Sequence, residues 1–168
     1  MSDLESGLYT IKCKLRDAPV GRHPVEDRTF NPKPVYALGE GNESPQWLVE
    51  KCEDGYILTN KGGRAAAIDG ALFAILSEEE NADKWVIEAQ RHQGENLYTV
   101  KTKEGLGWAQ VSEVGSEPDS FIIAVKELAV RESLPVQYLP NSLFEFSPVA
   151  LAEGAGASET TPVVDIQE

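Results

Sequence analysis

Residues 47–50 (WLVE) and residues 55–58 (GYIL), joined by a short polar turn, decide the fold because the chain repeats them. The second copy consists of residues 85–88 (WVIE) and residues 97–100 (LYTV). In each copy a tryptophan is followed by an aliphatic residue two positions on and then by an acid. A tyrosine between alternating partners stands in the second half of each copy. This spacing is typical of paired β-strands, in which successive side chains point to opposite faces.

A third copy is split between the two ends of the sequence, as residues 143–146 (LFEF) and residues 7–11 (GLYTI). Its tyrosine and those of the other copies are roughly 45 residues apart, within the range of repeats that bury a hydrophobic face only together. Because the last strand would pair with the first, we expect the repeats to close in a ring. Three repeats of four strands predict an all-β protein, a β-trefoil, with a six-stranded barrel capped by three hairpins and plugged by the repeated aromatic residues.

Further β-branched or aromatic runs, bounded by Gly, Pro, Asn and Asp, predict a total of about twelve strands. Hairpin turns are expected at residues 53–55 and 93–96, where Gly, Asp and Asn tolerate a positive φ. Residues 77–83 favour a helix by composition but have no apolar stripe, so we predict a loop. The remaining strands are expected near residues 20–22, 34–38, 64–68, 71–76, 106–110 and 121–126.

The composition predicts one folded domain over residues 1–149 and an acidic, disordered tail over residues 150–168. Of the 168 residues, 41% are hydrophobic, which is enough for a sizeable core. The net charge of −13 repels nucleic acid and anionic membranes, so neither is expected as a partner. No run of apolar residues is long enough for a membrane helix.

The N-terminal residues show no basic region followed by an apolar run, which predicts a protein without a signal peptide that stays in the cytoplasm. In that reducing compartment we expect Cys13 and Cys52 to be free thiols, although they follow equivalent strands.

The sequence offers no enzyme chemistry, and no cofactor or metal is predicted. The two histidines, His23 and His92, have no ligand spacing with a cysteine and are expected in surface loops. The glycines at residues 62–63 and 105–107 lack the strand–helix context of a phosphate-binding loop, so we interpret them as turn glycines. A nucleophile with an adjacent base is also missing.

One loop stands out by its chemistry, the segment of residues 23–34 (HPVEDRTFNPKP). Prolines near both of its ends restrict the backbone. Arg28 stands at its centre, and an extended, stiff loop that presents one long basic side chain is what a trypsin-like protease accepts as a substrate. An arginine beside Glu26 and Asp27 also fits a surface residue paired with its neighbours.

In several segments the sequence resembles the β-trefoil serine protease inhibitors of mushrooms, the cospin-like family. The resemblance extends over residues 7–148. The segments that carry it are GLYTIK at residues 7–12, GR at 21–22, EDR at 26–28, WLVEK at 47–51 and LFEFSP at 143–148.

The resemblance implies reversible, substrate-like inhibition of a trypsin-like serine protease by a monomer. The loop between the second and third strands of the family carries the residue that enters the protease specificity pocket, and the matching residue here is Arg28. Thr29 would then follow the bond presented to the protease, and the contact set would be Glu26, Asp27, Arg28, Thr29 and Phe30.

Two other functions stay open at this level. A sugar-binding trefoil is one, although the repeated Gln-x-Trp pattern of such lectins is missing. Inhibition of cysteine proteases through residues 60–63 or 105–107 is the other. Arg64 is a reserve contact for a second protease, and the other basic residues are expected to be solvated: Lys33, Lys61, Arg91 and Arg131.

Overall fold

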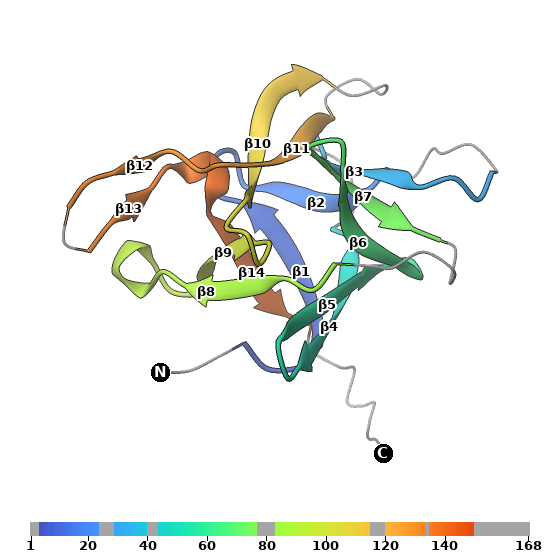
Figure 1. Cartoon of the computed structure of the whole chain (residues 1–168), viewed down its shortest axis with the longest axis horizontal. Helices are drawn as coiled ribbons and strands as arrows, with labels where there is room; N and C mark the ends of the chain where they lie inside the picture. The colour runs from blue at the N-terminus through green and yellow to red at the C-terminus, as the bar shows by residue number, and fades with distance from the viewer. Residues whose placement is uncertain are drawn as a thin grey trace, which may run out of the picture.

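A computed structural model describes residues 4–23, 29–39, 44–76, 83–114, 120–133 and 135–149, with the backbone alone at residues 112–114. Six strands form a closed ring in which each is paired with the next, the β5–β8 link being an isolated bridge. The last strand of the chain pairs with the first, as the repeats predict (Figure 1). In ring order the strands are β1 (Gly7–Cys13), β4 (Gln46–Cys52), β5 (Gly55–Asn60), β8 (Val86–Ala89), β9 (Leu97–Lys101) and β14 (Phe144–Pro148).

Three hairpins cap the barrel, and the second strands of the three pair with one another. This arrangement is the predicted β-trefoil, in which β1 to β4 form the first repeat, β5 to β8 the second and β9 to β14 the third. The hairpins are β2 (Ala18–Arg22) with β3 (Lys33–Ala37), β6 (Gly63–Ile68) with β7 (Ala71–Ile75), and β10 (Gly107–Val114) with β11 (Phe121–Lys126).

The register repeats the sequence pattern three times. Tyr9 lies opposite Trp47, and Tyr56 lies opposite Trp85. At the third position Tyr98 lies opposite Phe144. The two halves of each sequence copy pair as β4–β5, β8–β9 and β14–β1. The first two pairs are hairpins, and the third joins the two ends of the barrel sequence. The ring therefore alternates between these pairs and the tyrosine–aromatic pairs.

The barrel is plugged by four aromatic side chains, all with no exposed surface. Three of them are the predicted Trp47, Trp85 and Phe144. The fourth is Trp108 of β10, whose central role the repeats did not predict because Trp108 lies outside the repeated motif. Its ring centroid lies 6.0 Å from that of Trp47, 5.5 Å from that of Trp85 and 5.6 Å from that of Phe144. Trp108 therefore joins the three repeats.

The structure departs from twelve strands through one added hairpin in the third repeat. Fourteen strands occur in the described residues, and the two additional ones are β12 (Val130–Arg131) and β13 (Gln137–Tyr138). The Gln93 side chain donates to the Tyr138 carbonyl (2.9 Å) and accepts from the Tyr138 amide (2.8 Å). β12 and β13 have only two residues each, which is too short for an alternating pattern to predict them.

The turns follow the sequence closely. The turn at residues 53–54 joins β4 to β5, and a Cβ atom on Gly55 would lie 2.9 Å from the carbonyl oxygen of Trp85. The expected turn at residues 93–96 overlaps the 3₁₀ helix η1 (Arg91–Gln93), and a second 3₁₀ helix, η2 (Pro140–Ser142), precedes β14. Most of the expected loop at 77–83, and the whole of the expected tail at 150–168, lie outside the described residues.

The two cysteines are free thiols, as expected. Burial raises the pKa of the Cys13 thiol to about 11, so it is protonated at neutral pH. In the described ranges no three His, Cys, Asp or Glu side chains are grouped to hold a metal ion. No helix among the same residues is long and apolar enough to cross a membrane.

Candidate functional site

The loop with the unusual sequence connects β2 to β3, as the resemblance implies. The two strands stay paired as far as Arg22 and Val35, and the chain leaves the hairpin beyond this pair. Glu26, Asp27 and Arg28 lie outside the residues that the structure describes, so their role as contacts stays a prediction. Thr29 and Phe30 are described, and both are exposed.

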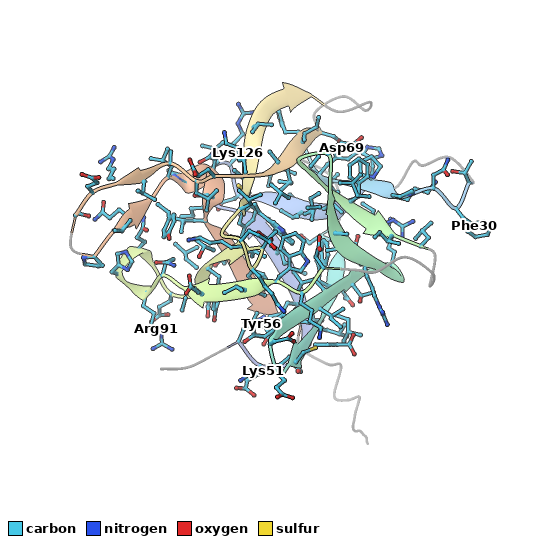
Figure 2. All side chains as sticks on the ribbon, in the orientation of Figure 1. Phe30, Lys51, Tyr56, Asp69, Arg91 and Lys126 are labelled. Carbon is cyan, nitrogen blue, oxygen red and sulfur yellow. The ribbon has the colours of Figure 1, made fainter. Side chains whose placement is uncertain are left out.

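Phe30 projects from the end of this loop, away from the rest of the molecule (Figure 2). Its side chain is 84% exposed, whereas the other exposed large hydrophobic residues of the described chain are 37–45% exposed. Single exposed apolar residues are ordinary on protein surfaces, but an almost fully exposed phenylalanine on a loop is typical of a contact residue.

The loop is attached to the barrel at two ends, which we call its stalks: Arg22 at the end of β2 and Lys33 at the start of β3. Asn60 of the second repeat fixes the first stalk. The backbone amide of Arg22 donates to the Asn60 side-chain oxygen (2.9 Å). The amide nitrogen of the same Asn60 side chain donates to the Gln46 carbonyl (2.8 Å), so one buried side chain ties β2 to β4. Asn60 is only 1% exposed, and an amide in such a place stabilises only if its polar atoms are paired.

Arg22 itself strengthens this connection, since its guanidinium donates to the Lys61 carbonyl (2.8 Å) and to the Asn60 carbonyl (3.4 Å). Gly21 allows β2 to lie close to the Pro45 ring, because a Cβ atom at Gly21 would lie 2.4 Å from that ring. The loop therefore leaves the barrel at Arg22, whose backbone amide and guanidinium are both hydrogen-bonded to residues 60–61.

The second stalk is held by Lys33, and the prediction that Lys33 is solvated is wrong. Its exposed fraction is 3%, because β3 begins there and pairs with Ala74 of β7. The Lys33 ammonium donates to the Thr29 hydroxyl oxygen (3.3 Å), which also accepts from the Asn31 amide (3.3 Å). These bonds close a bend over residues 29–31 and leave Phe30 at its apex.

The other basic residues behave as predicted, since Lys61, Arg64, Arg91 and Arg131 are exposed. Arg64, however, is the second residue of β6 and pairs with Ile75, so it is not presented by a loop. A strand residue held in a ladder lacks the free backbone that a protease cleft requires, which weakens Arg64 as a reserve contact.

Neither histidine belongs to a group that could hold a metal ion among the described residues. His92 is exposed in η1, where its Nε2 lies 2.8 Å from the Val136 carbonyl oxygen. His23 is half-buried where the chain leaves β2.

An ion-pair cluster lies at the opposite end of the β4–β5 hairpin from Asn60. Asp54 accepts from Lys84 (3.0 Å) and from Lys103 (2.8 Å). Lys103, and then Lys84, lower the pKa of the Asp54 carboxyl to about 2 by hydrogen bonding. All three side chains are about half exposed, so the cluster is screened by water and contributes little at neutral pH.

A family model described as peptidase inhibitor I66 matches residues 1–148, which include the whole described barrel and the loop. The chain belongs to the peptidase inhibitor I66 family. A curated relative named serine protease inhibitor, from Lentinula edodes, is 36% identical over 144 residues, which cover 84% of this chain and 96% of that protein.

Solved structures agree with this family assignment. A proteinase inhibitor from Coprinopsis cinerea is 34% identical, with a TM-score of 0.79 over 88% of this chain and 100% of that chain. A ricin B-like lectin from Macrolepiota procera, solved with lactose, has a TM-score of 0.58 over 88% of this chain and 100% of that chain, but is only 12% identical. The lectin shares the trefoil fold alone. The predicted resemblance to fungal β-trefoil inhibitors is confirmed, and the I66 family consists of inhibitors rather than enzymes.

The sequence did not predict the residues that hold the loop. Asn60 carried a usable signal, because it continues the inward phase of Tyr56 and Leu58 in a strand where an apolar residue is expected. The inward amide indicates a specific polar partner.

Proposed function

We propose that this chain is a reversible, substrate-like inhibitor of trypsin-type serine proteases and that Arg28 is its primary contact. The observation that carries the proposal is membership of the I66 family, with a serine protease inhibitor as a relative along most of the chain. The anchored ends of the β2–β3 loop, and the exposure of Thr29 and Phe30, support the choice of site.

In the proposed complex the Arg28 guanidinium enters the specificity pocket and pairs with the carboxylate that trypsin-type enzymes hold at its base. Such a charge-assisted pair is short and, once desolvated, among the stronger contacts of an interface. The protease serine then faces the Arg28 carbonyl, and Thr29 lies on the leaving-group side. Glu26 and Asp27 precede the bond and contact the enzyme surface.

The two stalks explain why a protease would stall on such a loop instead of releasing two ends. Arg22 is fixed to Asn60 and Lys61, and Lys33 is fixed to β7 and to Thr29. If the Arg28–Thr29 bond were cut, the new ends would stay close together and the bond could re-form. Preorganisation of this kind also lowers the ordering cost of binding.

Phe30 has a different proposed part, as a second contact in an apolar recess of the protease on the leaving-group side. The bend over residues 29–31, closed by the Thr29 hydroxyl, argues against Phe30 as the primary residue. A primary residue lies in extended backbone that pairs with the protease as an added strand.

The test is a titration of the full chain against trypsin, chymotrypsin and papain in parallel. We expect stoichiometric inhibition of trypsin, and Arg28→Glu should weaken it by on the order of 1,000-fold or more because the reversed charge faces the pocket carboxylate. Arg28→Lys should retain most of the inhibition, since trypsin-type pockets accept both basic side chains.

Arg64→Glu is the matched control, because it makes the same charge change at an exposed strand position. If Arg28→Glu inhibited trypsin as well as the unaltered chain does, the primary contact would lie elsewhere. Inhibition of papain alone would show that the protein inhibits cysteine proteases instead.

We also propose that the protein is a monomer and binds one protease, and the end point of the titration measures this ratio. We further propose that the protein acts in the cytoplasm, which localisation of the tagged full-length protein tests.

A further inference from the structure

A cleft separate from the β2–β3 loop lies where the first and third repeats meet. Its volume is about 350 Å³, within the range of small-molecule sites. Leu15 and Arg16 of the β1–β2 turn line it on one side, β10 and β11 on another, and Leu139 to Asn141 at the start of η2 on the third. No acidic side chain is found among the described residues that line it.

The wall of the cleft contains an acceptor without a donor. Gln110 lines the cleft with an exposed fraction of only 3%, and its side-chain oxygen has no hydrogen-bond partner among the described residues. A buried acceptor of this kind costs free energy, so it indicates a missing partner. The Asn141 side chain donates to the Gln110 backbone carbonyl (3.1 Å), which fixes η2 against β10.

The rim of the cleft contains a cation that is held in place. The Arg16 guanidinium carbon lies 4.9 Å from the centre of the Phe121 ring, and both residues line the cleft. A cation–π contact of this kind orients the guanidinium without neutralising its charge. The remaining lining is mainly apolar, with Leu15, Val111 and Leu139 as branched side chains.

We propose that this cleft binds a small carboxylic acid with a branched apolar body and one N–H or O–H donor, the chemistry of an N-acyl apolar amino acid. The carboxylate pairs with Arg16, the donor satisfies the Gln110 oxygen after a small adjustment of that side chain, and the branched body packs between Val111 and Leu139. The same chemistry occurs in free acyl amino acids and at peptide C-termini. The proposal is independent of protease inhibition.

The experiment is a titration of the full-length, isotope-labelled protein with N-acetyl-L-leucine, followed by backbone amide NMR. We expect saturable shifts confined to the cleft, at Leu15, Arg16, Val111 and Leu139, with a Kd of about 1 mM or tighter for a ligand of this size. N-acetyl-L-leucinamide keeps the shape and removes the charge, so it should bind about tenfold more weakly. A longer acetylated peptide ending in leucine distinguishes the two sources, and tighter binding of the peptide would assign the cleft to peptide C-termini.

Two variants test the named contacts. Arg16→Gln and Gln110→Leu should each weaken binding of N-acetyl-L-leucine by roughly fivefold to tenfold. Arg64→Gln is the control for a general loss of positive charge and should leave binding unchanged. Gln110→Leu should also unfold at the same or a higher temperature, because it removes an unpaired buried oxygen. Shifts that do not saturate, shifts outside the cleft, or equal binding of the acid and the amide would overturn the proposal.

Discussion

The β2–β3 loop and the aromatic centre of the barrel place their aromatic side chains in opposite environments. Four aromatic side chains in the centre are fully buried, and three of them pack against the fourth, Trp108, whereas Phe30 in the loop is 84% exposed. The centre draws its residues from all three repeats, and the described loop belongs to one repeat and is braced by a second. Stability and binding should therefore respond to different substitutions, and the residues that join the two regions should affect both.

The largest effect on stability is expected from Trp108→Ala. Its indole contacts Trp47, Trp85 and Phe144 at once, so its removal leaves a cavity that the barrel cannot close. We expect a loss of about 3–5 kcal/mol in the free energy of unfolding, measured by denaturant titration. Trp85→Ala should cost a similar amount, and both variants should inhibit trypsin normally wherever they remain folded. A loss below about 1 kcal/mol would contradict the central role of these side chains.

Asn60→Ala should affect both regions, because Asn60 is buried yet holds the Arg22 stalk. Losing its two hydrogen bonds and leaving their partners unpaired should cost about 1–3 kcal/mol of stability. The variant should also be cleaved in its loop during long incubation with trypsin, which electrophoresis detects. Thr59→Ala, at the neighbouring half-buried position, is the control. A stable variant with an intact loop would show that the stalk does not depend on Asn60.

Phe30→Ser should affect binding alone. The exposed side chain makes no contribution to the core, so the unfolding temperature should not change. Loss of the proposed second contact should weaken trypsin inhibition by roughly tenfold to a hundredfold, mainly through faster dissociation. Leu48→Ser, at a 40% exposed position on the barrel, is the matched control. Inhibition as tight as that of the unaltered chain would exclude Phe30 from the interface.

The smallest effect, a pH dependence, is expected at Asp54. The carboxyl pKa is about 2 in the folded protein and lies near 3.8 without its lysine partners. The lowered value means that the carboxylate contributes stability above about pH 4 and loses that contribution as the pH falls toward 2. Thermal unfolding of Asp54→Asn should therefore decline less steeply than that of the unaltered chain between pH 4 and pH 2, with no change in trypsin inhibition. Parallel pH profiles would show that the ion pairs have no influence on folding.

The parts of the fold that repeat were predictable, and the parts that break the repeat were not. Trp47, Trp85 and Phe144 recur with their tyrosines, so the ring and its register follow from the pattern. Trp108 lies outside the repeated motif, and a tryptophan that does not recur carries no period that would place it at the centre.

At the candidate site the loop could be predicted, because its prolines and central arginine interrupt the strand pattern. Its supports could be predicted only in part, because the inward phase of Asn60 in β5 signals a buried amide but does not identify Arg22 as its partner. Lys33 is buried by pairing with β7, a segment distant in sequence, and looks the same in sequence as a solvated lysine.

The pairing of β14 with β1 has a consequence for synthesis in the cell. The first strand of the barrel must wait for its last strand to complete its pairing, because Ile11 of β1 lies opposite Phe146 of β14. Until the ribosome has released nearly the whole barrel, this strand has an open edge, which is the kind of surface that chaperones bind and that aggregation uses. The ring can therefore close only after β14 has been made, and the folding rate should be limited by contacts between these two distant strands.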